Sequence, residues 1–487
     1  MSKIEVNEIT QQTGTTLTVG GGACKTATVD ATTITLGNNT GTSTISLNTG
    51  AAFGGGIDAV LWETTPQTGS FQATKGKGYF MNTTSGALTL TTPASPSAGD
   101  IFAVADYART FATNNLTISP HASAKIGGQA ASATLDVNGQ ASTFVYVDST
   151  QGWINVQNAE DTETGTSFIE ATGGTITTVC TNFKVHTFTG PGTFCVSNAG
   201  SPQGSNEISY LVVAGGGGGS ANGGGGGGAG GYREGKSPQT PYTSSPLACT
   251  SGSNNGLPVA VASYPVQVGG GGAGVSSGRS CNGSNSVFAG TTTITSTGGG
   301  GSGTFCGSAS PTAAAVIGAN GGSGGGGSGG TSVPSIPSIP SANKGSGNTP
   351  PVSPSQGNDG GRGMHSGSYT PTGAVGGGGG GGAGGTGGEP VLNPGTGGTG
   401  GVGTPTQITG SAVSYAGGGG GGIGPGTGFT TPAGSPCGTG GAGGKHPGTD
   451  AVAGTDNRGG GGGGGGHQPQ AGQNGGSGVV IIRYKFQ

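Results

Sequence analysis

Residues 230–237 read GGYREGKS and match GxxxxGK[ST], the pattern of the loop that cradles nucleotide phosphates. That loop has to leave a strand and open a helix, because the helix N-terminus holds the phosphates. Here Lys236 and Ser237 run directly into PQTPYTSSP, whose prolines are incompatible with a helix. Since 120 of the 487 residues are Gly, a chance match is expected. The pattern therefore predicts no nucleotide site.

Carboxylates cluster only at AEDTETG, which holds Glu160, Asp161 and Glu163. A glycan-cleaving enzyme would need two carboxylates roughly 5–10 Å apart across its substrate. A run of neighbouring acids between Thr and Gly is more typical of a polar linker between domains. We therefore expect no catalytic residues, no cofactor and no enzymatic activity.

The five histidines are dispersed and form neither an HxH nor an HxxxH pair, so the sequence predicts no metal site. His467, which follows a glycine run, is the one candidate, and only if one histidine from each chain of a trimer met on the axis. The others are His121, His186, His365 and His446.

Seven cysteines leave at least one thiol unpaired within a single chain. Cys180 and Cys195 lie on two expected strands joined by GPG, so we predict a disulfide across a hairpin, with buried free thiols as the alternative. Cys24 would be the odd one. The connectivity of four further cysteines stays open: Cys249, Cys281, Cys306 and Cys437.

Composition excludes several classes of partner. Only 7% of the residues are charged, the net charge is −3 and no basic patch is visible, so nucleic acid is not an expected partner. The start, MSKIEVNEIT, has no apolar stretch of a secretory signal. The longest apolar run, Val479–Ile482, is far short of the ~20 residues that span a bilayer, so we expect no membrane insertion.

Three parts follow from the distribution of strands and glycine, and the chain is expected to be mainly β. Residues 1–56 hold short alternating pieces such as TTLTVGG, too thin to bury a core alone, which predicts an N-terminal β stalk or attachment segment in a trimer. Residues 57–160 hold strand candidates with turns every 8–14 residues or so, which suits a small antiparallel sandwich or barrel. The candidates are 78–82, 87–91, 101–106, 116–119, 132–136, 143–147 and 153–156.

Residues 165–487 form the glycine-rich part. It opens with an expected strand pair, 177–189 and 193–198, and two apolar strands, ISYLVVA at 208–214 and VVIIRYKF at 479–486, bracket the glycine runs. We expect these two strands to pair and the rest to be an insertion. The runs read as packed polyglycine-II helices, which have three residues per turn and make all their hydrogen bonds to neighbours. The alternatives are flexible linkers, collagen and disorder.

In this bundle the segments between the runs become loops, and rigid scaffolds with irregular loops are a common plan for binding surfaces. Aromatic side chains there are candidates for contact with a sugar or a surface protein. The alternative is that they fasten their loops to the bundle. The candidates are Tyr242, Tyr264, Phe288, Tyr369, Tyr415 and Phe429.

Three segments resemble parts of phage structural proteins. MSKIEVNEITQQTGTTLTVGG is similar to the opening of tail-fibre and decoration proteins of marine and cyanobacterial phages, and GYFMNTTSGALTLTTPASPSAGD with STFVYVDSTQGWINV resembles a repeated fibre module. FKVHTFTGPGTFCV, ISYLVVAGGGGGS and GGSGVVIIRYKF resemble the glycine-rich domain of such fibres. In composition, the third part is also similar to phage adhesins whose glycine helices present receptor-contacting loops.

The resemblance implies a homotrimeric tail fibre or receptor-binding protein, assembled in the host cytoplasm and located in the virion. Its expected partners are other virion tail proteins and a host surface glycan or outer-membrane protein. A purely structural virion protein, such as a head fibre or tail decoration, is the alternative, and a glycan-cleaving spike ranks last.

Overall fold

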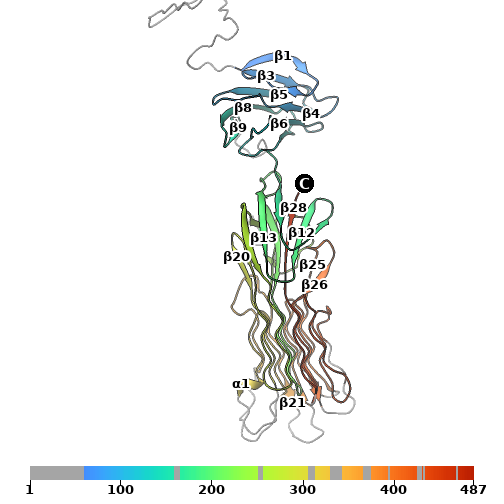
Figure 1. Cartoon of the computed structure of the whole chain (residues 1–487). Coiled ribbons are helices and arrows are strands. Elements are labelled where there is room, and N and C mark those ends of the chain that lie inside the picture. Colours follow the sequence, from blue (N-terminus) through green and yellow to red (C-terminus); the bar gives the residue numbers. More distant parts are fainter. Residues whose placement is uncertain are drawn as a thin grey trace, which may run out of the picture. The chain divides into compact units, whose positions relative to one another are not determined.

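The computed structural model describes most of the chain from Val60 onward, and the regular elements of this part are strands and one four-residue helix, α1 (Ala313–Val316) (Figure 1). The mainly β fold is therefore confirmed. The expected stalk and the acidic linker lie outside the described residues. Those residues are 60–157, 165–249, 256–304, 313–329, 343–365, 375–392, 395–424, 430, 434–467 and 470–487.

The middle part consists of two sheets with the strand orders β1-β3-β5-β8-β9 and β2-β4-β6-β7. Phe102, Phe144 and Trp153 are fully buried in its core and their rings are in contact. Trp62, in contrast, is 37% exposed on the first strand. The strands are β1 (Leu61–Gln67), β2 (Phe71–Gln72), β3 (Lys77–Met81), β4 (Leu88–Thr91), β5 (Ile101–Asp106), β6 (Leu116–Ser119), β7 (Ala133–Leu135), β8 (Ala141–Asp148) and β9 (Gly152–Asn155).

The direction of these strands departs from the expected antiparallel sandwich. All seven expected strands are present, but β1, β3 and β5 run parallel, as do β2, β4 and β6. The chain crosses to the opposite sheet after each of the first strands, so it returns to a given sheet in the same direction. The antiparallel pairs of these two sheets are β5 with β8, β8 with β9, and β6 with β7. Turn spacing alone does not distinguish a hairpin within one sheet from a connection that crosses to the opposite sheet.

The glycine-rich part contains a five-stranded sheet, β10-β13-β18-β19-β20, and a larger sheet, β11-β12-β28-β14-β15-β16, with β17 paired to β14. The expected pairing of the bracketing strands is confirmed: β14 and β28 are antiparallel, with Val213 opposite Val479 and Ser209 opposite Arg483. Both strands are buried on both faces, which explains their continuous apolar sequences.

The bounds of these strands show one error of the sequence interpretation. The strand expected at 177–189 is interrupted, because Cys180 and Thr181 adopt positive φ and turn the chain from β11 into β12. The GPG turn then leads β12 into one sheet and β13 into the other. The strands are β10 (Ile169–Thr172), β11 (Thr175–Val179), β12 (Phe183–Phe188), β13 (Gly192–Ala199), β14 (Glu207–Val213), β15 (Tyr232–Gly235), β16 (Ala248–Cys249), β17 (Leu257–Pro258), β18 (Ala262–Gln267), β19 (Ser286–Ala289), β20 (Thr293–Ser296) and β28 (Val479–Lys485).

The glycine runs form a hydrogen-bonded lattice of extended rods. In the run 215–220, three successive N–H groups donate to three different neighbouring rods. The next three N–H groups donate to the same three rods in the same order. The carbonyl oxygens accept from three further neighbours in the same rotation. The donors reach 281–284, 473–476 and 225–228, and the carbonyls accept from 299–302, 272–275 and 462–465. Three residues per turn and bonds only to neighbours are the polyglycine-II arrangement that we expected.

Rods of either direction satisfy this lattice. The run 225–231 is antiparallel to 297–303, because Gly225 bonds Gly303 and Gly231 bonds Thr297. The same run is parallel to 378–381, where the paired numbers rise together. The rods therefore need no common chain direction.

Close approach is what demands glycine inside the lattice. A Cβ on Gly227 would fall closer than 3.0 Å to the backbone of Gly217 in the next rod. Serines occur where side chains from several rods share one space, as at Ser220, Ser280 and Ser302, whose hydroxyl groups bond one another. The interior thus admits only side chains that make lattice bonds of their own or fit a shared gap.

Surface rods need glycine or alanine at fewer positions. Along 450–455 only Ala451 and Gly454 are buried, three residues apart, while the residues between them are exposed. Because the three faces of such a rod repeat every third residue, one small residue in three is enough on the inner side. The lattice consequently extends into segments that are poor in glycine.

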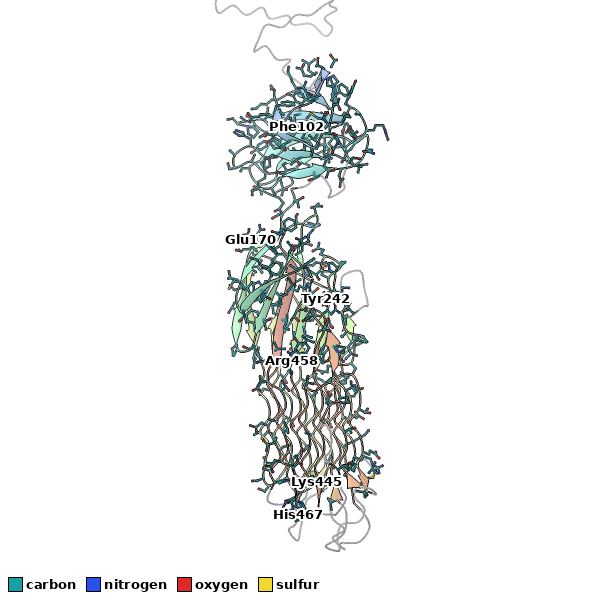
Figure 2. All side chains as sticks on the ribbon, turned by 90° about the vertical axis from the view of Figure 1, so that its right-hand side faces the viewer. Phe102, Glu170, Tyr242, Lys445, Arg458 and His467 are labelled. Atoms are coloured by element: carbon teal, nitrogen blue, oxygen red, sulfur yellow. The ribbon has the colours of Figure 1, made fainter. Side chains whose placement is uncertain are left out.

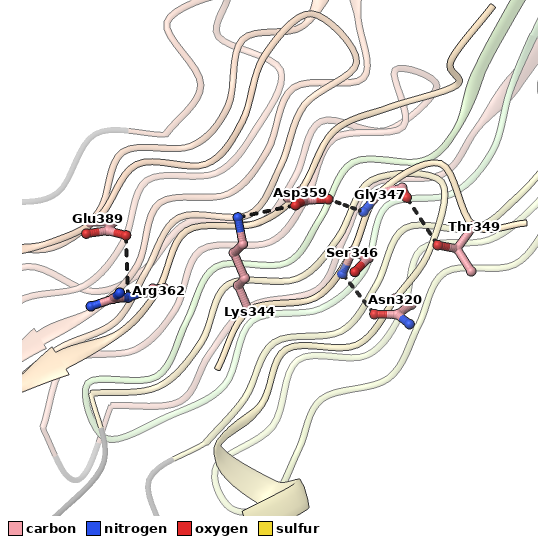
Figure 3. A network of polar contacts seen from close by, with 8 residues as sticks. All are labelled: Asn320, Lys344, Ser346, Gly347, Thr349, Asp359, Arg362 and Glu389. Carbon is pink, nitrogen blue, oxygen red and sulfur yellow. Dashed lines mark hydrogen bonds and ion pairs between the residues drawn. The ribbon is translucent and has the colours of Figure 1, made fainter. Parts of the chain in front are cut away.

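Asn and Asp side chains close the lattice where a neighbouring rod is missing. The Oδ1 atom of Asn320 accepts from the N–H of Ser346 at 2.8 Å, and Asp359 accepts from Gly347 at 2.9 Å (Figure 3). Asp359 also forms an exposed ion pair with Lys344, whose contribution to stability is small. An acceptor on a side chain thus replaces the carbonyl that an absent rod would supply.

We expect Asn285→Ala to lower the free energy of unfolding by about 1–2 kcal/mol, because it leaves the buried Gly298 N–H without its acceptor. Asn285→Asp keeps an Oδ atom in place and should behave nearly as the wild type. Guanidinium unfolding of the two variants tests this, and equal losses for both would contradict the capping role.

Candidate functional site

Two of the expected binding aromatics lie in strands of the five-stranded sheet. Tyr264 on β18 is 7% exposed, and Phe288 on β19 is fully buried. Their rings contact each other and Phe194, at centroid distances of 6.1–6.5 Å. The expectation that they stand on exposed loops is wrong, because Tyr264 and Val266 alternate inward and extend the core. Tyr369 and Phe429 lie outside the described residues.

Tyr242 and Tyr415 lie beside the larger sheet and are held by polar contacts. The hydroxyl of Tyr242 donates to Glu234 at 3.1 Å, and the guanidinium of Arg458 lies 4.9 Å from the ring centre of Tyr415. Tyr415 is buried and Tyr242 is half-buried. Both positions agree with the alternative in which these aromatics fasten their segments to the rest of the domain.

Glu234 is the centre of a buried polar network that the sequence interpretation missed. Its carboxylate, 2% exposed, accepts from the hydroxyls of Tyr232 at 2.7 Å and Thr406 at 2.6 Å, and from the N–H of Ser245 at 3.0 Å. Burial, together with this carboxylate, raises the pKa of Tyr242. The network joins the strand β15 (Tyr232–Gly235) to β25 (Thr404–Thr406), which pairs with β26 (Val413–Tyr415).

Arg483 supports the same junction from β28. Its guanidinium is 1% exposed, donates to the carbonyls of Ile408 at 3.1 Å and Pro241 at 3.3 Å, and lies 4.6 Å from the ring centre of Phe183. Burial lowers the pKa of this group. The only charged residue in the run VVIIRY marks this position in the sequence. Both buried charges bind the chain's own groups, so their role is to anchor segments.

The predicted Cys180–Cys195 disulfide is wrong, since both residues are free thiols. Cys180 lies in the turn between β11 and β12, whereas Cys195 lies on β13 in the other sheet, opposite Ser263. Cys281 and Cys437 are free thiols as well. Burial alone would raise the pKa of the Cys437 thiol, but hydrogen bonds with Ser435 and Thr439 lower it below its ordinary value.

Within the described part of the chain, no three His, Cys, Asp or Glu side chains gather into a group that could hold a metal ion. His186 belongs to the core: its Nδ1 lies 2.7 Å from the Gly173 carbonyl, and its Nε2 lies 3.1 Å from the Tyr484 hydroxyl. Burial lowers the pKa of this imidazole. In the same residues, no helix is long and apolar enough to cross a membrane.

The candidate functional site is one end of the rod lattice. Figure 1 shows α1 and β21 at this end and the two large sheets at the other. A three-stranded sheet closes it, with Met364 opposite Gly376 and Val375 opposite Gly424. Lys445 and His467 lie at the same end (Figure 2). The short strands of the lattice are β21 (Met364–His365), β22 (Val375–Gly376), β23 (Val391–Leu392), β24 (Gly395–Thr396) and β27 (Ile423–Gly424).

Hydrogen bonds connect the residues that border several segments at this end. Thr304 donates to Ala315, and Gly329 donates to Gly223 at the turn between the first two rods. The segments 305–312, 330–342, 366–374 and 425–429 therefore leave and re-enter the described structure there. They hold only a part of the sequence between the glycine runs, including the repeated Pro and Ser of SVPSIPSIPS.

One of two comparisons with known proteins supports the expected glycine-rich domain. A search of curated proteins finds no match for the chain. The family model described as a glycine-rich domain matches residues 189–485, which is more than half of the chain. The match begins at the GPG turn and ends within β28, so it encloses the rods together with the two strands that bracket them. The chain therefore belongs to the glycine-rich domain family.

Proposed function

We propose that this protein is a virion tail fibre or adhesin that binds the host cell surface at the lattice end, the end of the rod lattice at which α1 and β21 lie. The observation that carries the proposal is that the residues flanking four Pro-containing segments lie at one end of a scaffold whose rods are hydrogen-bonded to neighbours on every side. Rigid scaffolds that present variable segments at one end are well suited to recognition. The phage origin rests on the resemblance of all three parts of the chain.

The proposed partners are a host surface glycan or an outer-membrane protein, other virion tail proteins, and two further copies of the chain in a homotrimer. The protein acts by binding and not by catalysis. Because Tyr264, Phe288 and Tyr415 are buried, the proposal attributes recognition to other residues at the lattice end.

A structural virion protein, such as a head fibre or tail decoration, is the second candidate. It is favoured by the same burial, because every expected binding aromatic among the described residues is buried or half-buried. In this role the whole lattice would serve only as a rigid shaft.

Cell binding separates the two candidates. Full-length protein with a fluorescent label is tested on a panel of marine bacteria, cyanobacteria included. Segments 305–312, 330–342 and 366–374 are replaced by Gly/Ser sequences of equal length. We expect the replacements to reduce cell binding to background. Replacement of 250–255, which connects β16 to β17 in the sequence, is the matched control and should leave binding unchanged.

Two outcomes count against adhesion. Binding that survives all the replacements would place recognition elsewhere, and a virion map with the chain on the capsid would favour decoration. Release of reducing sugar ends from surface polysaccharide would instead indicate a glycan-cleaving spike.

A further inference from the structure

Two histidines lie side by side at the lattice end because of the register of two parallel rods. Gly441 donates to Gly461 and Gly444 donates to Gly464, so each residue of the first rod lies beside the residue 20 positions later. The rods end together, the first at Lys445 and His446 and the second at His467. Two histidines that are separated in the sequence are thereby brought to neighbouring positions.

The backbone around this pair is fixed by one side chain. Gln470 accepts from the Gly466 N–H at 3.2 Å and donates to the Lys445 carbonyl at 3.1 Å, so it joins the ends of the two rods. Lys445 also forms a bridge with Ile423 of a third parallel rod. The imidazole rings of His446 and His467 have centroids 6.2 Å apart and planes inclined by 39°.

We propose that His446 and His467 together bind one divalent transition-metal ion of the Zn²⁺ or Ni²⁺ class. Imidazole nitrogen is a preferred ligand of these ions, at about 2.0–2.1 Å for Zn²⁺. Two imidazoles on one tetrahedral ion then have ring centroids roughly 5–6 Å apart, by the same bond length. The observed separation is close to this range. His467 is exposed and His446 is half-exposed, so a hydrated ion has access to both rings.

The described residues add no third His, Cys, Asp or Glu to the pair, so water completes the coordination. Such a site binds its ion exchangeably. The ion would hold the ends of these two rods together. This role does not depend on the proposed adhesion, because metal binding is measured without a host.

Isothermal titration of the full-length chain without an affinity tag, using Ni²⁺ and then Zn²⁺ alone, tests the site. We expect one ion per chain and a loss of at least about tenfold in affinity for His446→Ala and for His467→Ala. His121→Ala, in the middle part, is the matched control and should bind as the wild type. Gln470→Ala should weaken binding without abolishing it, since it loosens the spacing but keeps both ligands.

Imidazole NMR signals provide a second measurement that does not rely on variants. Added Zn²⁺ should shift or broaden the ring signals of His446 and His467 and leave that of His121 unchanged. The proposal is overturned by the absence of binding at millimolar metal, or by binding that neither histidine substitution weakens. A shift of only one of the two signals would also reject the shared site.

Discussion

Gly227→Ala is expected to lower the free energy of unfolding of the glycine-rich domain by about 3 kcal/mol or more, at the upper end of overpacking effects. Gly227 lies where several rods meet: it donates to Gly462 at 2.8 Å and accepts from Gly419 at 3.0 Å. An added Cβ would collide with the backbone of Gly217, and backbone atoms held by bonds on every side have nowhere to move. Guanidinium unfolding followed by circular dichroism measures the loss.

Gly270→Ala is the matched control. It lies in a surface rod, and a Cβ there would have no heavy atom within 4 Å. We expect unchanged stability or a gain of up to ~1 kcal/mol, because alanine restricts the unfolded chain more than glycine does. Equal effects of the two substitutions would show that the runs are not packed as described.

Glu234→Ala should lower the free energy of unfolding by about 3 kcal/mol or more. The substitution removes the acceptor of three hydroxyl groups and one N–H, and each buried donor left unsatisfied costs ~1–3 kcal/mol. Thr406 and Tyr242 would lose their fastening to β15. We therefore expect hydrogen exchange to accelerate around 404–415 in this variant, in addition to the earlier unfolding.

Glu389→Ala is the control of the same residue type. Its carboxylate forms an exposed ion pair with Arg362 at 3.5 Å, which is worth less than about 1 kcal/mol. If Glu234→Ala were no more harmful than Glu389→Ala, the buried network would not be the anchor of these segments.

Local patterns predicted a large part of the fold. The strands 101–106 and 116–119 were placed correctly from alternation and flanking turns. The pairing of β14 with β28 followed from two apolar segments at either side of the glycine runs. The parallel order of β1, β3 and β5 did not follow, because strand direction depends on where each connection crosses and short turns leave no mark of that.

The glycine runs predicted the interior rods of the lattice, but the sequence interpretation missed the rods at its surface. Segments 280–285 and 450–455 contain few glycines and lie between the runs, where the sequence predicts loops. In the structure, 281–284 accept hydrogen bonds from 215–220, and 450–455 bury every third residue. The prediction that the aromatic candidates stand on exposed loops was wrong for a related reason. Tyr264 and Phe288 lie near glycine runs in the sequence, but strand alternation turns them into the core. Glu234 and Arg483 were overlooked because their partners are distant in the sequence.

The indifference of the rods to chain direction bears on how such a protein can evolve. In a β-sheet, a new strand must match the direction and pleat of its neighbour, so insertions are confined to a few places. A rod of either direction finds the same donors and acceptors, as 225–231 does between 297–303 and 378–381. Recombination can therefore add or exchange a rod together with its end segment while the neighbouring rods keep their bonds. Variation of the end segments is in this way uncoupled from folding of the shaft.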